Sequence, residues 1–477
     1  MLCAGCAAAA PQTESAARAV APVAALDAGE RAEVYLDVSS PPGGDGSRER
    51  PFRSFAEAPA HGRLHLASGV YPGGVALEDV EVIGGSAVVL AASPPAACVR
   101  ARGPVRIEGV QIQGGAQGVV VENGRATLEG VRLSGQRGPA IEVTEGGALT
   151  LLRSALHASV SGFPGLRVQP GGRAELREVR FQGPFRRAIE ATRPGTLGLA
   201  RVDLEGAVTG LWLSGGSASV EGFEARGGRG PGLYVAGGAL QLRDVRVRGH
   251  EYGLLTGEGA RVDGKGLSSV GAELSGVALV GTKGVLEDVH VESPGRLAAV
   301  QLVSSEVRIR GLEVRGGLLG LLARSAQLTL EGGTIAAVRS EQSNEGDAIQ
   351  IRGGRASLAG VRIQDCGGIG VLAAEAAEVT LSRSTIAGSG VAGLSAETLA
   401  RLLATGVSIE RTTGPAVLVI DRGTVQLRAV TARNNRDGVA WAECDQGGTV
   451  EVDGLTADMA LPPTPCIRTL SPVTPRR

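Results

Sequence analysis

The chain has 477 residues, of which 43% are hydrophobic, 3% are aromatic and 74 are glycine. The 48 Lys and Arg residues balance the 49 Asp and Glu residues without blocks of one sign, which argues against nucleic-acid binding and against a basic membrane-binding patch. The hydrophobic content excludes a disordered glycine-rich linker, and no apolar run reaches the roughly 18 residues of a membrane-spanning helix.

The first 30 residues form a segment of their own, which begins MLCAGCAAAAP. Ala4, Gly5 and Cys6 resemble the end of a bacterial lipoprotein signal, in which small residues precede a lipidated cysteine. This resemblance implies lipidation at Cys6, a signal remnant and flexible tether over residues 1–30, and a missing leader upstream of Met1. It implies an outer-membrane lipoprotein or a secreted protein, with the lipid as its only membrane contact. Cys3 stands where the signal prefers leucine, and a frayed alanine-rich terminus is the alternative.

From about residue 75 onward the chain repeats one pattern roughly every two dozen residues. Residues 125–147 read RATLEGVRLSGQRGPAIEVTEGG, and residues 306–326 read EVRIRGLEVRGGLLGLLARSA. Each unit has two short alternating runs, a glycine-rich bend, a third alternating run and a further turn. Alternation places one set of side chains inside and the other outside. The first unit therefore predicts inward Leu128, Val131, Leu133, Ile141 and Val143, and outward Glu129, Arg132, Ser134 and Glu142.

The three runs of a unit are predicted to pair with the same runs of the next unit. The bends between them are too open for hairpins, which favour two-residue turns. Pairing between units gives three parallel sheets around a stacked aliphatic core, with glycine at the bends. We therefore predict an all-β fold, a single-stranded parallel β-helix of about 16 rungs over residues 75–466. Residues 31–74 would form an N-terminal cap and first strand, and residues 467–477 a disordered tail.

The repeats resemble right-handed parallel β-helix proteins of the pectate-lyase-like superfamily over about four-fifths of the chain, and right-handedness is implied by this resemblance. Residues 34–85 resemble the N-terminal module of secreted bacterial β-helix proteins. The matching residues are Gly44-Asp45-Gly46, Pro51-Phe52, Ser54-Phe55, Ala58, Gly69 and Tyr71. Phe52, Phe55 and Tyr71 are expected to close the open end of the core. Pro59 should shorten the capping helix to a turn or two.

Two cysteines near the C-terminus predict a disulfide. Cys444 and Cys466 are one repeat apart, which places them on neighbouring rungs about 4.8 Å apart. That separation lies within the range that a disulfide tolerates. Cys98 and Cys366 are expected to be unpaired. Because the histidines are scattered, we expect no metal site, and we expect no cofactor.

The strongest catalytic candidate is the segment SEQSNEGDAIQI, residues 340–351. Residues 344–351 resemble the N-T-D-G-x-D-I motif of polygalacturonases, which implies Asp347 and Glu345 as catalytic candidates and Asn344 as a substrate-binding one. Gln364-Asp365-Cys366 partly matches that family's Q-D-D-C motif, which adds Asp365. The family's G-H-G and R-I-K motifs have no counterpart. Asp347 also falls at a turn position of the repeat, where aspartate bonds the local backbone, and we expect this turn role.

Other surface residues have a functional and a structural interpretation. An outward Trp212 would stack on a sugar ring or fill a surface groove. His250-Glu251-Tyr252 carries acid–base groups, but we expect a solvated bend there. Outward arginines interleaved with acids would bind uronic-acid polymers or, as we expect, form a soluble mixed-charge surface. They are Arg132, Arg153, Arg177, Arg243, Arg308, Arg362 and Arg428.

The incomplete catalytic set and the short turns favour a binding protein. We predict a monomeric, non-catalytic, extracytoplasmic β-helix protein of the bacterial envelope that binds polysaccharide or an envelope protein along its flank. The alternative is a polysaccharide lyase or glycoside hydrolase with its site around residues 341–365. Such an enzyme needs converging acids and a base, and the fold alone does not decide between the two.

Overall fold

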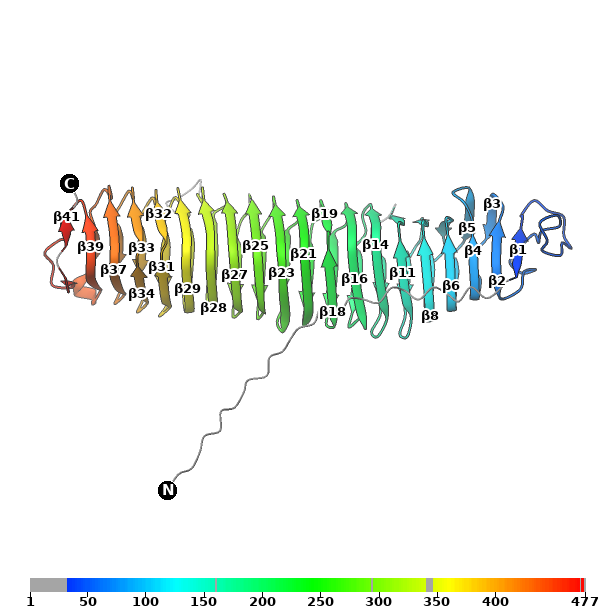
Figure 1. The fold of residues 1–477 in the computed structure, drawn as a ribbon, viewed down its shortest axis with the longest axis horizontal. Coiled ribbons are helices and arrows are strands. Elements are labelled where there is room, and N and C mark those ends of the chain that lie inside the picture. Colours follow the sequence, from blue (N-terminus) through cyan, green and yellow to red (C-terminus); the bar gives the residue numbers. More distant parts are fainter. Residues whose placement is uncertain (1–31, 159–160, 293–294, 340–345, 472, 476–477) are drawn as a thin grey trace, which may run out of the picture.

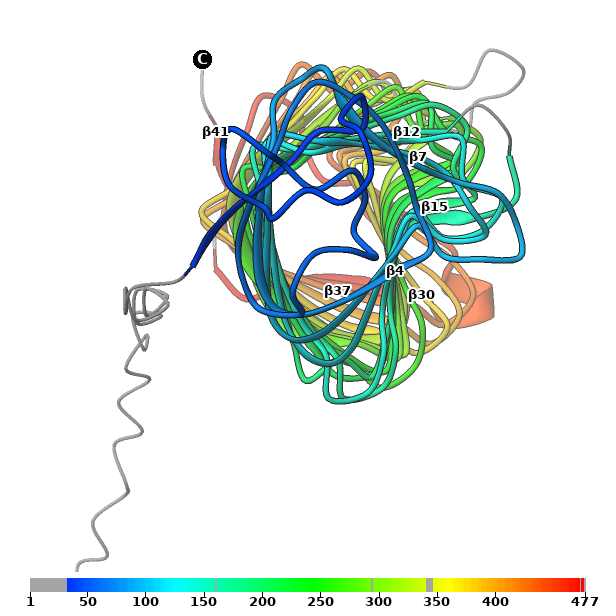
Figure 2. The ribbon, with the colours of Figure 1, turned by 90° about the vertical axis from the view of Figure 1, so that its right-hand side faces the viewer.

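The protein is a straight rod of stacked coils (Figure 1). The computed structural model describes residues 32–158, 161–292, 295–339, 346–471 and 473–475. Successive coils superpose when the rod is viewed along its axis (Figure 2). All strand pairs within the described residues are parallel, and each strand pairs with its counterpart in the neighbouring coil. The predicted all-β parallel β-helix of about 16 turns is confirmed.

The pairings divide the strands into three sheets that run the length of the rod. Sheet A contains β1 (Glu33–Leu36), β2 (Gly62–Leu66), β11 (Ala148–Leu152), β18 (Ser217–Glu221), β31 (Glu378–Ser382), β34 (Arg401–Thr405) and β40 (Ile467–Thr469). Sheet B contains β3 (Gly69–Pro72), β5 (Val88–Ala92), β7 (Gln111–Gly114), β9 (Arg132–Ser134), β12 (Ala155–His157), β19 (Glu224–Arg226), β32 (Thr385–Ala387), β35 (Ser408–Glu410) and β41 (Thr474–Pro475). Sheet C contains β10 (Ile141–Val143), β13 (Pro164–Val168), β15 (Arg187–Thr192), β17 (Thr209–Ser214), β20 (Pro231–Ala236), β22 (Tyr252–Thr256), β24 (Ser275–Val280), β26 (Ala298–Val303), β30 (Val371–Ala374), β33 (Leu394–Ala396), β36 (Val417–Val419) and β38 (Ala440–Ala442).

Longer strands turn a corner and belong to more than one sheet. Those running from sheet C into sheet A are β4 (Val75–Ile83), β6 (Val99–Glu108) and β8 (Val119–Glu129). Those running from sheet A into sheet B are β14 (Arg173–Gln182), β16 (Thr196–Glu205), β21 (Gly238–Arg248), β23 (Ala260–Val270), β25 (Lys283–Glu292), β27 (Glu306–Arg315), β37 (Thr424–Arg433) and β39 (Thr449–Ala457). β28 (Leu319–Ala336) and β29 (Ile349–Gln364) pass through all three sheets.

The corner between sheets A and B is made by one residue with a left-handed backbone. Asp244 occupies it in β21 with φ of 52°, and Gly266 occupies it in β23 with φ of 75°. Glycine reaches this region without strain, and aspartate is among the side chains that tolerate it best. The frequent glycines of the repeat therefore turn the chain without interrupting the ladder of backbone hydrogen bonds.

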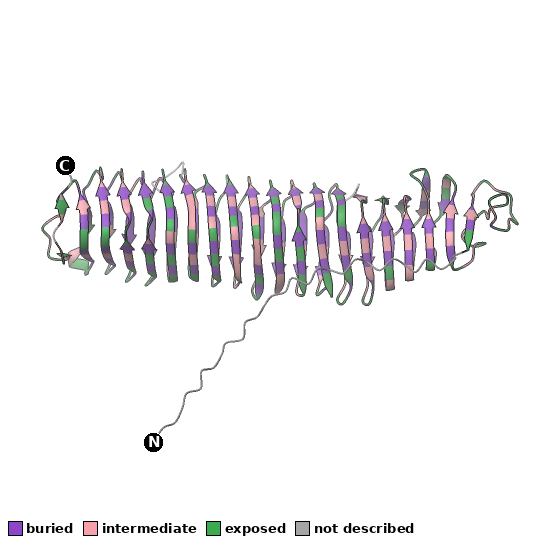
Figure 3. Ribbon diagram, viewed as in Figure 1, coloured by how far each residue is buried: buried purple, intermediate pink, exposed green. Residues whose placement is uncertain are grey.

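The core is a set of aliphatic columns, one residue from each coil. Leu128 lies beside Leu151 of the next coil, and Leu151 lies beside Leu176 of the coil after that. The five side chains predicted to point inward are all buried: Leu128, Val131, Leu133, Ile141 and Val143. Buried and exposed bands alternate along the strands in Figure 3. Burial of these columns provides the main stabilisation of the rod.

One residue predicted to face water does not. Glu142 lies on the outer face of sheet C, yet it is only 9% exposed. Gln117 and Gln169, from the coils on either side, donate hydrogen bonds of 3.2 and 2.8 Å to its carboxylate. The alternating pattern predicts the direction of the side chain correctly but does not show that neighbouring glutamines cover it.

Aromatic residues lie at the N-terminal end of the core. Tyr71 is fully buried, and its hydroxyl donates to the carbonyl oxygens of Leu36 and Ala67 at 3.0 and 2.9 Å. The ring of Phe55 meets it edge-on at 6.1 Å between centroids, and Phe52 packs against the same cluster. The segment around Pro59 forms turns instead of a helix.

The C-terminal end carries the predicted cysteine pair. Cys444 and Cys466 are joined by a disulfide, with their Cα atoms 5.4 Å apart. Cys444 also begins a short 3-10 helix, η1 (Cys444–Gln446). Beyond the disulfide, where the sequence predicts a disordered tail, β40 and β41 pair with β39, which supplies the free edge of the last coil. No helix in the part of the chain that the structure describes could span a membrane.

Candidate functional site

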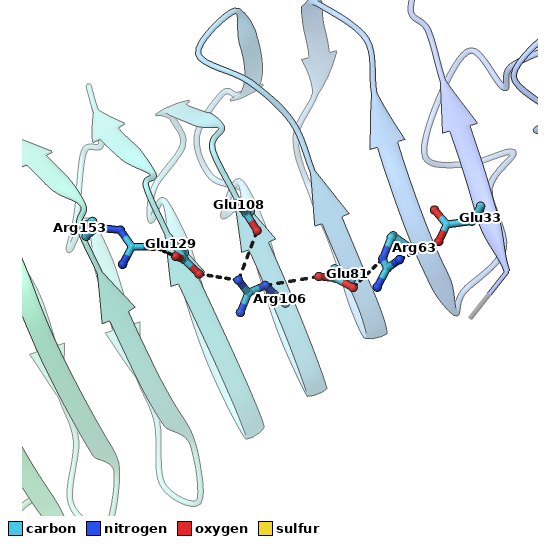
Figure 4. A network of polar contacts seen from close by, with 7 residues as sticks. All are labelled: Glu33, Arg63, Glu81, Arg106, Glu108, Glu129 and Arg153. Atoms are coloured by element: carbon cyan, nitrogen blue, oxygen red, sulfur yellow. Dashed lines mark hydrogen bonds and ion pairs between the residues drawn. The ribbon is translucent and has the colours of Figure 1, made fainter. Parts of the chain in front are cut away.

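Sheet A carries a ladder of ion pairs across its N-terminal coils (Figure 4). Arg63 lies 2.7 Å from Glu33 of the coil before it and 2.9 Å from Glu81 of the coil after it. Arg106 then bridges Glu81, at 3.4 Å, and Glu129. Glu33, Glu81 and Glu129 are therefore each matched by an arginine of a neighbouring coil. The pairing fixes these side chains against one another and leaves little charge for a ligand.

The outer surface of sheet A is hollowed further along the rod. A groove of about 1000 Å³ crosses eight strands, from β23 to β37, and we call it the sheet A groove. A second depression of about 570 Å³ over β18 to β25 shares Val285 with it. At about 4.8 Å per coil, the eight strands of the sheet A groove span roughly 34 Å along the axis. The groove is thus long, a shape that suits an extended polymer.

The hollow results from short side chains next to long ones. One outward column of sheet A includes Thr329, Ser357 and Thr380, which pair in register on successive coils. The adjacent outward column carries Arg355 and Glu378 on two of the same coils. The short residues form a floor with hydroxyl groups, and the long residues form a charged wall beside it.

The sheet A groove has an excess of positive charge. It is lined by five basic side chains and two acidic ones, which leaves a net charge of three (5 − 2) in a protein whose overall net charge is −1. These residues are Arg261, Lys283, Arg308, Arg355 and Arg401, with Glu306 and Glu378. Four of these five basic side chains are ion-paired within the described residues: Arg261 with Asp263 at 2.6 Å, Lys283 with Glu306 at 2.9 Å, Arg308 with Glu331 at 3.9 Å and Arg355 with Glu378 at 2.8 Å. Arg401 is exposed and has no ion pair in the same part of the chain.

The segment that suggests an enzyme lies on a different face, at the start of sheet C. Asn344 and Glu345 lie outside the described residues. Both carboxylate oxygens of Asp347 accept hydrogen bonds, one of 2.6 Å from the backbone N–H of Ile369 and one of 2.6 Å from Gln350. Asp347 therefore holds the turn of the next coil in place, as aspartate does at turns. Asp365 is exposed in the turn after β29 and has a left-handed backbone, with φ of 52°.

Glu397 is a carboxyl group that the sequence does not single out, and its charge interacts with that of Asp347. This carboxyl is half-buried, and burial raises its pKa above the ordinary value, against the opposing effect of a hydrogen bond from Ser395. The nearby charge of Asp347 raises the pKa of Glu397 further, while Arg352 lowers it. A carboxyl whose pKa is raised by burial is a basis for acid–base chemistry. Only the stacking of coils brings the two together, because they are 50 positions apart in the sequence.

Trp212 faces outward from β17, as predicted, but its ring is not open on both sides. The guanidinium carbon of Arg187, from the preceding coil, lies 3.7 Å from the ring centroid. Tyr234, from the following coil, stacks at 4.0 Å with a tilt of 32°. Burial lowers the pKa of Arg187, which also pairs with Glu190 at 3.0 Å. Protein groups thus flank the indole on two sides.

The sequence predicts a solvated bend at His250, but the side chain of His250 is only 2% exposed. Its Nδ1 lies 3.1 Å from the carbonyl oxygen of Gly230, and burial lowers its pKa. The ring fits because Gly228 lacks a side chain: a Cβ there would lie 2.4 Å from the imidazole. The bend is therefore a packed structural contact and not a surface acid–base pair. Its partner glycines lie a full coil earlier, which a local pattern does not reveal.

The two remaining described cysteines are buried and free. Burial raises the pKa of Cys98 to about 12 and also raises the pKa of Cys366. Both thiols therefore stay protonated and unreactive at neutral pH. Over the ranges that the structure describes, no three His, Cys, Asp or Glu side chains are grouped so as to hold a metal ion.

Comparison with known proteins identifies the fold. Residues 298–454 match the family described as "Right handed beta helix region". Among solved structures, tailspike protein 3 of bacteriophage CBA120 is 13% identical with a TM-score of 0.26, over 82% of this chain and 56% of the tailspike chain. This chain thus spans little more than half of the tailspike's length. No curated protein matches the sequence.

Two other solved structures match a similarly large share of this chain. A chain of the Vag8–C1 inhibitor complex is 14% identical with a TM-score of 0.27, over 94% of this chain and 99% of that one. The catalytic domain of a GH87 alpha-1,3-glucanase in complex with tetrasaccharides is 11% identical with a TM-score of 0.28, over 82% of this chain and 64% of that one.

Proposed function

We propose that the protein is a non-catalytic, extracytoplasmic β-helix rod of the bacterial envelope that binds a linear polysaccharide along its flank. The observation that carries the proposal is the sheet A groove, which crosses eight successive coils along the axis of the rod. Its floor offers the hydroxyl groups of Thr329, Ser357 and Thr380, and its wall offers charged side chains. A long groove on a rigid scaffold suits a polymer better than a small compact ligand.

Two features support the extracytoplasmic part of the proposal. The Cys444–Cys466 disulfide is typical of oxidising compartments outside the cytoplasm. The lipoprotein-like Ala4-Gly5-Cys6 sequence would attach a secreted rod to the outer membrane. The protein would then be a member of the secreted or lipid-anchored β-helix proteins that its N-terminal module resembles, a branch of the pectate-lyase-like superfamily.

Binding to an array of neutral and acidic polysaccharides tests the proposal. A Ser357→Trp variant fills the floor of the groove and should abolish binding of the polysaccharide that the parent protein retains. A Thr385→Trp variant is the matched control, because Thr385 is exposed on sheet B. Equal binding by the parent protein and the Ser357→Trp variant, or capture of an envelope protein with no polysaccharide, would rule out the groove as a glycan site.

A second candidate function is a polysaccharide lyase or glycoside hydrolase at the start of sheet C. Two carboxyl groups, Glu397 and Asp347, interact there, and burial raises the pKa of Glu397; glycoside hydrolysis uses a pair of carboxyl groups of which one has a raised pKa. Release of reducing or unsaturated ends from a polysaccharide, lost in both Asp347→Ala and Glu397→Gln, would establish this activity. The binding proposal expects no release of products by the parent protein.

A further inference from the structure

We propose that two copies of this chain form an antiparallel dimer through the outer face of sheet C, with a two-fold axis at Leu322. The sequence predicts a monomer, and the inference goes beyond the proposed function, because the sheet A groove lies on another sheet and stays accessible in such a dimer. The observation that carries the inference is a column of uncharged, outward side chains on eleven consecutive coils, which we call the sheet C stripe.

The sheet C stripe takes one outward side chain from each coil and has a tryptophan at either end. The strand register joins its members in this order: Trp212, Tyr234, Leu255, Ala278, Gln301, Leu322, Gln350, Leu372, Ser395, Leu418 and Trp441. None of them is charged, although 20% of the residues of the chain are. On the three coils before Trp212 the same column holds Glu142, Arg167 and Glu190. The outer face of sheet C therefore changes at Trp212 from a charged to an uncharged surface.

The strands under the stripe are apolar on both faces. β20, β22, β24 and β26 contain no charged residue, whereas β21, which runs through sheets A and B, contains four. Leu297 and Leu318, in the turns that lead into β26 and β28, extend the apolar surface and are each 40% exposed. A parallel strand that is apolar on both faces is normally covered on both. The core covers the inner face, and the second copy would cover the outer one.

The chain itself packs against this face at one place. Leu372 is only 4% exposed and belongs, with Ile369 and Ala392 from the turns before β30 and β33, to a small apolar cluster separate from the core. Trp441, at the end of the stripe, is 49% exposed. The outer face of sheet C thus already makes an apolar contact where a turn of the chain reaches it.

The size of the face matches a stable dimer. Ten coil spacings of about 4.8 Å give a length of about 48 Å, and strands of about five residues give a width of about 17 Å. The face therefore offers about 800 Å², which is the area that each side of a standard protein–protein interface buries. The rod is straight, so a second copy presents a face of the same length and shape without bending (Figure 1).

The order of residues in the stripe favours antiparallel copies. Leu322 is its middle member, with five coils on either side, so a two-fold axis there places Trp212 against the partner's Trp441. The same axis brings the apolar cluster around Leu372 opposite the coil of Ala278, whose short side chain leaves room for it. Each of these contacts occurs twice, as a two-fold interface requires.

Gln301 supplies a polar contact beside the axis. Its Nε2 is buried and has no hydrogen-bond partner within the described residues, which costs stability until the amide is paired. The antiparallel arrangement places Gln301 opposite the partner's Gln350. The Oε1 of Gln350 accepts a hydrogen bond of 3.1 Å from Arg352 and can accept a second. Rotation of the Gln301 amide, which exchanges Nε2 with Oε1, would direct its N–H groups to this acceptor.

One charge opposes the dimer and gives it a recognisable salt dependence. Arg324 is exposed, two residues after Leu322 on β28. A two-fold axis that crosses the rods at Leu322 keeps Arg324 opposite its own copy, so two like charges face each other. Salt screens this repulsion, and association should therefore strengthen as salt rises. Arg324→Leu should strengthen association further.

Sedimentation equilibrium of the full chain measures the dimer, with Leu322→Asp as the disrupting variant. We expect the dissociation constant of the dimer to rise by about tenfold or more in this variant. Val70→Asp is the matched control, because Val70 is 60% exposed on β3 of sheet B and lies away from the stripe. Circular dichroism and thermal unfolding establish that each variant is folded.

Cysteine cross-linking tests the orientation, in a chain whose Cys3 and Cys6 are replaced by Ser. Packed sheets lie about 10 Å apart, so a bismaleimide of that length joins facing positions. Leu322→Cys should cross-link to its own copy. Tyr234→Cys should cross-link to Leu418→Cys in a mixture of the two, and not to itself, because eight coils or about 38 Å separate the two copies of residue 234.

Several results would overturn the inference. A chain that stays monomeric at millimolar concentration has no such interface. A dimer that Leu322→Asp leaves intact, or that Val70→Asp weakens as much, does not use the sheet C stripe. Self-cross-linking of Tyr234→Cys would show parallel copies, and a dimer that salt weakens would contradict the facing arginines.

Discussion

The guanidinium of Arg63 lies 2.9 Å from the carboxylate of Glu81, its register partner on the next coil of sheet A. Arg106 continues the series to the coil beyond, so unlike charges alternate along the axis at the N-terminal end of the rod. In the sheet A groove the same alternation is incomplete, and Arg401 has no ion pair within the described residues. One sheet therefore carries a ladder of paired charges at its N-terminal end and an exposed arginine outside any such ladder further along.

Breaking the ladder should destabilise the N-terminal coils. Replacing Arg106 by Gln leaves Glu81, Glu108 and Glu129 without the cation that lies between them. We expect the free energy of unfolding to fall by about 1 kcal/mol, because the pairs are partly exposed and solvent screens them. Urea unfolding measures this loss, with Arg132→Gln on sheet B as the control. An Arg106→Gln variant as stable as the parent would show that the ladder contributes nothing.

Acid should weaken the pairing at Glu122. Hydrogen bonds from Arg102 and then Arg100 lower the pKa of Glu122 below its ordinary 4.5. The stabilisation is therefore complete above pH 4.5 and is lost as the pH falls through the lowered folded-state pKa. The melting temperatures of the parent and of Glu122→Gln should differ near neutral pH and converge in acid. A difference that does not change with pH would contradict this ion pair.

His250 should make stability sensitive to pH in a higher range. Because burial lowers its folded-state pKa from 6.5, the unfolded chain binds the proton more readily. Stability is then complete above pH 6.5 and falls as the pH decreases from there toward the lowered pKa. Melting temperatures between about pH 8 and about pH 5 should show this decline in the parent and a smaller one in His250→Gln. The same decline in both proteins would mean that other groups cause it.

The disulfide should stabilise the last coil. It closes a loop across 22 residues, and the chain-entropy relation gives about 3 kcal/mol for a loop of that length. The double variant Cys444→Ser, Cys466→Ser should therefore unfold earlier, and the parent with reductant should behave like the variant. Proteolysis followed by mass spectrometry should locate the new cleavage sites after residue 440. Cleavage spread evenly along the rod would contradict a local role.

The sequence predicts the core well because each coil repeats the same local rule. Leu128 and Ile141 are buried as their alternating pattern requires, and the left-handed corners lie at glycine and at residues such as Asp244. These features depend on neighbours within a few positions along the chain. The repeat then copies them from coil to coil.

The candidate sites are harder to predict because they depend on neighbours one or two coils away. Glu142 is covered by glutamines 25 and 27 positions distant, and His250 packs on glycines of the preceding coil. Glu397 approaches Asp347 only after the coils have stacked. The sheet A groove likewise needs the register between strands, which places Ser357 beside Thr329 and Thr380.

A structure of the protein saturated with an oligosaccharide of a polysaccharide that it binds is the sharpest test. Binding in the sheet A groove predicts sugar density over β25 to β34, beside Thr329, Ser357 and Thr380. Sugar bound instead at the start of sheet C near Asp347 and Glu397, or a sheet A that remains empty in the saturated complex, would contradict it.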